Sequence, residues 1–278
     1  MNSGNKIILI TGSTDGVGRR VAERLGTAGN TVLIHGRDAG RAESLRAAIE
    51  TTGGKAVIHR ADFASLDQVR ALAEAVARDY PRLDLLINNA GIGTGRPGTG
   101  RELSRDGHEL RLAVNHLAGF LLTRLLLPGL VTARGRIVNV ASAGQEAIDF
   151  DDVMLARGYS GGRAYRQSKL AQIMVTFDLA TELRGIGITV NALHPASYMN
   201  TTMVRRDGIA PLSSVDEGAD AILDVATSPQ RAGQTGLYLD GRNPARAHAQ
   251  AYDTRARARL HALSLTLVGL PAVPPAQS

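Results

Sequence analysis

The sequence predicts an α/β protein built on a doubly wound parallel sheet of seven strands, with helices on both faces. Short apolar runs rich in β-branched residues alternate with helical patterns along most of the chain, which is typical of a parallel sheet with crossover helices. A glycine-rich turn follows the first run directly, and small or polar residues follow most of the others. The expected strands are 6–10, 31–34, 56–59, 83–87, 136–141, 188–193 and 236–239.

Length and composition indicate one globular domain. The 278 residues are 44% hydrophobic and 21% charged and contain no cysteine, so a disulfide framework and a thiolate site are excluded. We expect a single domain over 1–242, a helical extension of it over 243–270, and a disordered tail over 271–278. Residues 1–6 lack the pattern of a signal peptide, and no apolar run approaches the ~20 residues that cross a bilayer. We therefore expect a cytoplasmic protein with no membrane partner.

The formal charge of +6 raises the question of a nucleic-acid partner. The basic residues are scattered along every expected helix, and the aromatic content of 4% leaves little surface for base stacking. We expect no nucleic-acid partner and no metal.

The first loop has the composition of a phosphate-binding turn. Its glycines stand between strand 6–10 and a helical pattern, so that backbone N–H groups and a helix N-terminus can face a pyrophosphate. We assign the turn to Gly12, close approach of a dinucleotide to Gly16, and close packing of strand and helix to Gly18. Asp15 should cap the helix or point outwards. The expected contacts are Gly12, Ser13, Thr14, Asp15, Gly16, Val17 and Gly18.

The end of the second strand bears on which dinucleotide is bound. In dinucleotide-binding folds an acid about 20 residues past the glycines bonds the ribose 2′-hydroxyl, and a nearby arginine accommodates a 2′-phosphate. This strand offers Gly36 and then Arg37, which favours NADP(H). Asp38 leaves NAD(H) open because it could contact the ribose, although it could instead cap the next helix.

Two further strand ends supply expected cofactor contacts. Asp62, with Phe63 beside it, follows the third strand, where a carboxylate could accept from an adenine amine or cap helix 66–79. Asn89, Ala90 and Gly91 follow the fourth strand, and small residues there would let backbone lie against the cofactor.

Tyr165 and Lys169 form the expected acid/base pair. Residues four apart on a helix share a face, so the phenol and the ammonium project into one space. A nearby positive charge lowers a tyrosine pKa from its ordinary value of about 10, which makes Tyr165 usable as a general acid/base near neutral pH. Only three of the 32 basic residues are lysines, which fits a position that needs a compact ammonium.

The segment 243–268 carries apolar residues at helical spacing with arginines between them. Such a helix can lie on a membrane or pack on the body of the protein, and the lack of an aromatic anchor favours packing. The stripe consists of Tyr252, Ala256, Leu260, Leu263 and Leu267.

Together these residues resemble the short-chain dehydrogenases/reductases. The resemblance covers roughly residues 6–241 and implies a Rossmann fold. The segment 106–115 and the long connection 142–165 are most similar to the retinol-dehydrogenase-like branch, whose members often take bulky apolar substrates. The motifs that carry the resemblance are Thr11-Gly12-x-x-x-Gly16-x-Gly18, Asp62, Asn88-Asn89-Ala90-Gly91, Asn115, Ser142, Tyr165-x-x-x-Lys169 and His194-Pro195.

The resemblance also implies a role for each catalytic residue. Tyr165 would exchange a proton with a carbonyl or alcohol oxygen while hydride moves to or from the nicotinamide. Ser142 would hydrogen-bond the same oxygen. Lys169 would lower the pKa of Tyr165 and bind the nicotinamide ribose, and Asn115 would hold a water that passes protons towards Lys169.

Three departures from the family pattern affect these expectations. Ala196 replaces the glycine that usually follows Pro195, and the expected threonine is displaced to Thr201 or Thr202, so contacts of Pro195 and Ala196 with the nicotinamide carboxamide are open. Asp15 brings a carboxylate to the phosphate loop. The C-terminal helix continues where many relatives stop and pair with another subunit, so we expect a homodimer rather than a tetramer.

The sequence therefore predicts an NADP(H)-dependent enzyme that interconverts a ketone or aldehyde and an alcohol on a mid-sized apolar small molecule. The first alternative is non-redox or net-neutral chemistry on the same fold, such as epimerisation, elimination or cyclisation. The second is a non-catalytic dinucleotide sensor, which would not need the catalytic residues. The substrate walls are expected from 92–107, 143–164 and 197–215. Their apolar lining is expected from Met154, Leu155, Tyr159, Tyr198, Met199 and Met203.

Overall fold

An eight-stranded sheet forms the centre of the computed structural model, which describes residues 5–96 and 98–271. Its strand order is β3-β2-β1-β4-β5-β6-β7-β8, and the pairs from β3 to β7 are parallel. This confirms the doubly wound parallel arrangement. The strands are β1 (Ile7–Ile10), β2 (Thr31–Gly36), β3 (Lys55–Arg60), β4 (Leu85–Asn88), β5 (Arg136–Val140), β6 (Thr189–His194), β7 (Tyr238–Asp240) and β8 (Asn243–Pro244).

The expected strand count of seven is wrong by one. β8 pairs with β7 in antiparallel register, with Asp240 opposite Asn243. Gly241 makes this tight hairpin possible because its φ of 57° lies in the left-handed region. A strand of two residues is too short to produce an alternating pattern, so the sequence carries no periodic signal for it.

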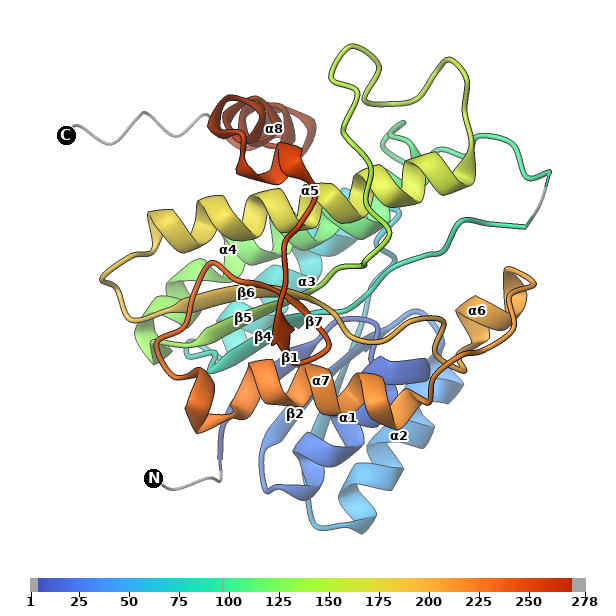
Figure 1. Ribbon diagram of the computed structural model, residues 1–278. Helices are drawn as coiled ribbons and strands as arrows, with labels where there is room; N and C mark the ends of the chain where they lie inside the picture. Colours follow the sequence, from blue (N-terminus) through green and yellow to red (C-terminus); the bar gives the residue numbers. More distant parts are fainter. Residues whose placement is uncertain (1–4, 97, 272–278) are drawn as a thin grey trace.

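Helices cover both faces of the sheet (Figure 1). One face carries α1, α2 and α7, and the other carries α3, α4 and α5, with α8 lying outside α5 (Figure 1). The α-helices are α1 (Gly16–Thr27), α2 (Ala39–Thr51), α3 (Leu66–Asp79), α4 (Ala118–Ala133), α5 (Gly161–Glu182), α6 (Thr202–Arg206), α7 (Val215–Thr227) and α8 (Thr254–Leu267). Shorter helical segments are η1 (Leu112–Leu117), η2 (Pro229–Arg231) and η3 (Ala249–Tyr252).

The central strands are apolar without interruption because both of their faces are buried. In β1, Ile8 and Ile10 point into the core shared with α1, α2 and α7, whereas Leu9 points into the core shared with α3 and α4. Side chains alternate between the two faces of a strand, so one short run serves both cores.

Of the three aspartates considered as helix caps, two cap a helix and one does not. Asp15 caps α1 by accepting from the Gly16 N–H at 2.8 Å, and Asp38 caps α2 by accepting from the Arg41 N–H at 2.9 Å. The alternative that Asp62 caps α3 is wrong, because that helix starts after Ser65 and its Leu66 N–H donates to the Asp106 carboxylate. The acceptor comes from a loop 40 residues away, which the local sequence does not indicate.

The C-terminal segment is less continuous than expected. Residues 243–268 contain β8, η3 and α8 rather than one helix, but α8 does pack on the body of the protein, against α5. Leu260 is buried as expected, but towards the end of α8 the buried leucine and valine are Leu265 and Val268, whereas Leu263 and Leu267 are only half-buried. The expected disordered tail falls, apart from Pro271, outside the described residues.

The expectation that no apolar stretch approaches the length that crosses a bilayer is wrong for one helix. The helical stretch Leu112–Ala133, which joins η1 and α4, is long and apolar enough by length and composition to cross a membrane. Its leucines, including Leu117, Leu121 and Leu130, lie in the core shared with α3, and half of the stretch is buried inside the protein. A core helix accounts for this composition.

Candidate active site

The predicted site residues follow the carboxyl ends of six neighbouring parallel strands. Parallel strands end at the same edge of a sheet, which is where ligands bind in open α/β sheets. The structure therefore brings together side chains that are far apart in the sequence. The residues at this edge are Gly12 after β1, Arg37 after β2, Asp62 after β3, Asn89 after β4, Ser142 after β5 and Pro195 after β6.

Neighbouring atoms leave little or no room for a side chain at the three glycines of the phosphate loop. Gly12 has φ of 63°, and a Cβ built on it would lie 2.8 Å from Cα of Ala90. A Cβ on Gly18 would lie 2.4 Å from the Gly12 carbonyl oxygen, which bears out the close strand–helix packing assigned to it. A Cβ on Gly16 would lie 3.2 Å from Cγ2 of Thr201, so this glycine faces the segment after β6.

The same loop fits a pyrophosphate. The first turn of a helix leaves N–H groups without intrahelical partners, and these favour anions. Asp15 takes up the N–H of Gly16, which leaves the N–H groups of Val17 and Gly18 as donors. The Asp15 carboxylate also pairs with Arg41 at 2.8 Å. Asp15 therefore caps the helix locally, as expected, and its charge is balanced by an arginine.

Asn89 acts on the phosphate loop through hydrogen bonds. Its amide nitrogen donates to the carbonyl oxygens of Thr11 and Gly12 at 2.9 and 3.1 Å. The backbone N–H groups of Asn89 and Ala90 both donate to the Thr11 hydroxyl. The first and fourth strand ends are thereby fixed to each other, and Gly91 continues this backbone towards Asn115 and Lys169.

An exposed arginine, Arg37, follows β2 at this edge of the sheet. The Arg37 side chain is 69% exposed and lies 3.7 Å from the Asp62 carboxylate. Asp62 also accepts from the Ala64 N–H, which shapes the loop after β3. Phe63 is buried, and its ring stacks on His35 with centroids 4.3 Å apart, so the side chain of Phe63 faces the protein interior.

Ser142 is held in place through its main chain. Its carbonyl oxygen accepts from the Gln145 amide at 3.0 Å and from the Tyr238 hydroxyl at 3.1 Å. Gln145 in turn accepts from the N–H of His248, which belongs to the C-terminal extension. The Ser142 hydroxyl accepts from the Gly144 N–H and lies on the side of Tyr165. The extension after β8 thus helps to position the predicted catalytic serine.

The predicted effect of Lys169 on Tyr165 is not what the structure gives. Burial raises the pKa of Tyr165 above its ordinary value of 10.0, and the hydrogen bond with Ser142 opposes this rise. The Lys169 ammonium lies 5.8 Å from the Tyr165 ring centroid and donates to the Val140 carbonyl and the Gln172 amide oxygen, both at 2.9 Å. The spacing of four residues does place Tyr165 and Lys169 on one face of α5, but the Lys169 side chain is directed towards the end of β5.

Burial has the opposite effect on the lysine. Lys169 is 5% exposed, and desolvation lowers its pKa to about 7. An ammonium with this pKa is present in both protonation states near neutral pH. Lys169 can therefore exchange a proton at the pH at which a general acid/base is needed.

Asn115 lies in the π-helical segment η1, and a π-bulge inside an α-helix is frequent at functional sites. Its amide oxygen accepts from the Ile92 N–H at 2.8 Å. Its amide nitrogen donates to the Ile92 carbonyl and the Ser168 hydroxyl. Asn115 therefore ties the segment after Gly91 to the helix that carries Tyr165. The water-binding role implied by the resemblance stays a prediction.

The segment after β6 returns over the phosphate loop. Pro195 is buried and Ala196 is half-buried, and His194 bonds the Ser197 hydroxyl at 3.0 Å. The side chain of Thr201 caps α6 and packs against Gly16. Of the two threonines considered, Thr201 is the one that lies on the phosphate loop.

The three expected substrate loops are tied to one another. Asp207, at the end of α6, accepts from both the N–H and the hydroxyl of Thr94 at 2.9 and 3.0 Å. Arg111 donates to the Gly93 carbonyl and to the Tyr159 hydroxyl, and its guanidinium is 3% exposed. These contacts join residues 92–107 to 143–164 and to 197–215.

The expected apolar lining is partly wrong. Leu155 is buried, Met154 packs on the core, and the Tyr159 hydroxyl is bound by Arg111, so these three side chains face the interior. Met199 packs with the core on the α1 and α7 side, whereas Tyr198 and Met203 are exposed. Side-chain direction in a long loop depends on tertiary contacts, which composition does not reveal.

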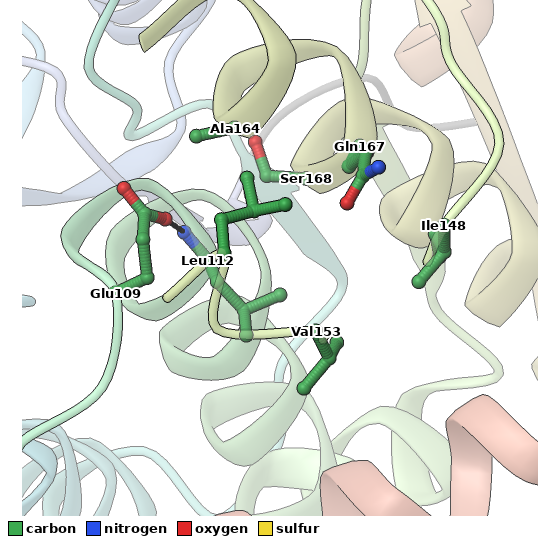
Figure 2. Close-up of a pocket in the computed structure, with 8 residues that line it drawn as sticks. Glu109, Leu112, Ile148, Val153, Ala164, Gln167 and Ser168 are labelled. Carbon is green, nitrogen blue, oxygen red and sulfur yellow. Dashed lines mark hydrogen bonds between the residues drawn. The ribbon is translucent and has the colours of Figure 1, made fainter. Parts of the chain in front are cut away.

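A small hollow lies beside the start of α5, between that helix and the loop 148–155 (Figure 2). Its lining does not include Ser142, Tyr165 or Lys169, but it does include Ser168, whose hydroxyl accepts from the Asn115 amide. Among the described residues, no group of three or more His, Asp or Glu side chains is placed to hold a metal. The lining residues of the hollow are Glu109, Leu112, Ile148, Val153, Leu155, Ala164, Gln167 and Ser168.

Several residues that shape the site were missed from the sequence. His35 bonds Gly12, Gln172 bonds Lys169, and Tyr238 bonds Ser142. Only His35 gave a signal, because it is a polar residue at the end of an otherwise apolar run. Gln172 lies within a helix pattern and Tyr238 within a strand pattern, where neither stands out.

The chain belongs to the short chain dehydrogenase family, whose sequence profile matches residues 6–209. It lies near the retinol-dehydrogenase-like branch. Retinol dehydrogenase 13 from Homo sapiens is 37% identical over 72% of this chain and 65% of its own length. Retinol dehydrogenase 12 from Homo sapiens is 32% identical over 95% of this chain and 87% of its own length. The chain spans just under two thirds of the length of retinol dehydrogenase 13.

Solved structures share the fold over most of the chain. An uncharacterised protein from Mycobacterium paratuberculosis superposes with a TM-score of 0.79 at 29% identity, covering 97% of this chain and 96% of that one. A 3-ketoacyl-(acyl-carrier-protein) reductase from Brucella melitensis complexed with NADH has a TM-score of 0.69 at 30% identity, covering 86% and 98%. The Pseudomonas aeruginosa RhlG/NADP active-site complex has a TM-score of 0.70 at 28% identity, covering 85% and 94%. Both cofactor types therefore occur among similar structures.

Proposed function

We propose that this protein is an NADP(H)-dependent oxidoreductase that interconverts a ketone or aldehyde and an alcohol on a mid-sized apolar substrate. The observation that carries this proposal is the meeting of Ser142, Tyr165 and Lys169 at one edge of the sheet, beside a loop that fits a pyrophosphate. When bound, the nicotinamide dinucleotide donates or accepts the hydride. Membership of the family and its similarity to retinol dehydrogenases support the same chemistry.

The roles of the three side chains follow from their surroundings. Tyr165 keeps its proton at neutral pH because burial raises its pKa, so it acts as the acid towards a carbonyl oxygen. Ser142 donates to the same oxygen, because its hydroxyl lies on the side of Tyr165. Once Tyr165 has given its proton to the carbonyl oxygen, the protonated form of Lys169 supplies a proton that restores the phenol, and its pKa of about 7 makes this form available near neutral pH.

Three observations support NADP(H) over NAD(H). A Cβ on Gly36 would lie 2.5 Å from the Thr14 side chain, so this position has no room for the acid that bonds a ribose hydroxyl. Asp38 is used as the cap of α2. Arg37 is exposed and paired only loosely with Asp62, which leaves its guanidinium available to a 2′-phosphate.

The substrate preference rests on the surface of the segment 197–215. Tyr198, Met203 and Leu212 are exposed there, and Leu212 is 73% exposed. Clusters of exposed apolar side chains mark binding surfaces for apolar partners. Because this segment also contacts the phosphate loop through Thr201, it supports entry of an apolar substrate near the cofactor.

Direct titration of the purified protein with NADPH and NADH, followed by nicotinamide fluorescence at fixed salt, tests the proposal. We expect clear preference for NADPH, and then consumption of NADPH with at least one member of a panel of apolar ketones and aldehydes. Tyr165→Phe is the control, since it should bind NADPH and turn nothing over. Preference for NADH would overturn the cofactor assignment, and binding of neither would overturn the redox function.

A further inference from the structure

His35, the fifth residue of β2, contacts the phosphate loop at two consecutive residues. Its ring nitrogen Nδ1 accepts the N–H of Gly12 at 3.1 Å. Its backbone N–H donates to the Ser13 hydroxyl at 3.0 Å, and its carbonyl accepts from the Ser13 N–H at 2.9 Å. His35 is 3% exposed, so these contacts are sheltered from water. One residue thus fixes the start of the loop.

The partners of the ring define its tautomer. The other ring nitrogen, Nε2, lies 3.2 Å from the Ala61 carbonyl oxygen, which can only accept. Nε2 therefore carries the hydrogen, and Nδ1 is left as the acceptor that the Gly12 N–H needs. Protonation of Nδ1 would place its N–H opposite the Gly12 N–H, and two donors cannot form a hydrogen bond with each other. The contact with Gly12 requires a neutral imidazole.

The ring is also held in its plane. Phe63 stacks on it with centroids 4.3 Å apart and an interplanar angle of 25°. Phe63 follows β3 and is itself buried. The stack and the bond to Ala61 leave the imidazole one orientation, with Nδ1 directed at Gly12.

The Gly12 peptide is consequently fixed on every side. Its N–H is bound by His35, its carbonyl by Asn89, and its Cα is packed against Ala90. Because the N–H of Gly12 is used by His35, the anion donors of the loop come from the start of α1. Their placement depends on the backbone path that begins at Gly12.

We propose that His35 is a positioning residue for the dinucleotide, whose neutral Nε2–H imidazole sets the Gly12 peptide and so the conformation of the phosphate loop. This inference rests on the proposed dinucleotide-binding function. The inference assigns a positioning role to His35, a residue that touches no substrate and acts through Gly12.

The electrostatic surroundings keep the ring neutral. Burial lowers the pKa of His35 to about 4, against the opposing effect of the bond to Ala61. The charged and titratable groups that face the ring are His59 on β3, Arg37 after β2 and Asp62 after β3; the first two lower its pKa and Asp62 raises it. At neutral pH the acceptor on Nδ1 is therefore available.

Two substitutions separate positioning from a merely structural role. His35→Asn keeps an acceptor near the place of Nδ1 but loses the aromatic stack and the bond to Ala61. His35→Phe keeps a ring of similar size for the stack but leaves the buried Gly12 N–H without an acceptor. We expect His35→Phe to weaken NADP⁺ binding about tenfold in calorimetric titration, and His35→Asn to weaken it by less than about threefold.

Thermal unfolding of the same proteins provides the contrast. We expect His35→Asn to be the less stable variant, because it loses buried apolar contact, although it binds the cofactor better. If His35 had only a structural role, the less stable of the two variants would also bind NADP⁺ more weakly. That result would overturn the proposal. His59→Phe is the matched control, since His59 pairs with His35 in the neighbouring strand and should leave the NADP⁺ affinity unchanged.

Nitrogen NMR of histidine-labelled protein tests the tautomer directly, with His35→Asn identifying the signal. We expect the neutral Nε2–H form from about pH 8 down to about pH 5. An Nδ1–H form, or titration near the ordinary value of 6.5, would refute the acceptor role. Wild-type protein that binds neither NADP⁺ nor NAD⁺ refutes the proposed function, whereas unchanged affinity in His35→Phe refutes the role of His35 alone.

Discussion

Replacement of Lys169 by methionine should change how the stability of the protein depends on pH. The Lys169 ammonium is buried at 5% exposure, and its two hydrogen-bond partners, the Val140 carbonyl and the Gln172 amide, are both neutral. Desolvation lowers its pKa from the ordinary 10.5 to about 7. Between these two values the unfolded chain holds a proton that the folded chain does not. The wild-type protein therefore gains stability as the pH rises from about 7 to about 10.

The size of the effect follows from the shift. Each pKa unit corresponds to about 1.4 kcal/mol, so the wild-type free energy of unfolding should rise relative to that of Lys169→Met by about 1.4 kcal/mol per pH unit in this window. Over the whole shift this amounts to about 5 kcal/mol. Methionine removes the buried charge but leaves two acceptors without a donor, at a cost of about 1–3 kcal/mol each. At pH 7 the free energy of unfolding of the variant should therefore lie between about 1 kcal/mol below and about 3 kcal/mol above that of the wild type.

Urea unfolding followed by circular dichroism at about pH 7, 8 and 9 measures the difference between the two proteins. Groups other than Lys169 titrate in both, so their contributions cancel. Lys55→Met is the matched control, because it makes the same substitution at an exposed lysine. Parallel stability curves for wild type and Lys169→Met would show that Lys169 is not desolvated in the folded protein.

Three further predictions concern the site directly. Tyr165→Phe should lower the turnover number by at least about 10²-fold with little change in the Kd for NADPH, and wild-type turnover in steady-state assays would remove Tyr165 from its role. Arg37→Ala should weaken NADPH about 10- to 100-fold in fluorescence titration and leave NADH unchanged, so equal losses would contradict a phosphate contact. Gly12→Ala places Cβ 2.8 Å from Ala90 at φ of 63°. It should destabilise the protein by about 1–3 kcal/mol in urea unfolding, and wild-type stability would mean the loop can move aside.

The sequence was sufficient for the fold because its signals are local and repeated. Continuous apolar runs identify buried parallel strands, and the phosphate loop places its glycines where positive φ or close packing requires them, as Gly12 and Gly18 confirm. The caps at Asp15 and Asp38 were also readable, since a capping carboxylate and its N–H partner lie within three residues of each other.

The features that the sequence did not predict depend on contacts between distant segments. The cap of α3 comes from Asp106, and the direction of the Lys169 side chain is set by the end of β5 and by Gln172. Neither can be obtained from helix spacing, because a lysine side chain has several rotamers and its surroundings decide among them.

The sequence alone predicts the parallel sheet, the loop that fits a dinucleotide, and the set Ser142, Tyr165 and Lys169, because apolar runs, glycine spacing and helix spacing are local patterns. The ionisation and orientation of these side chains depend on how distant segments pack. Burial raises the pKa of Tyr165 and lowers that of Lys169, and His35 holds Gly12 across 23 residues of sequence. Desolvation and long-range hydrogen bonds arise when segments pack, so no stretch of sequence contains them.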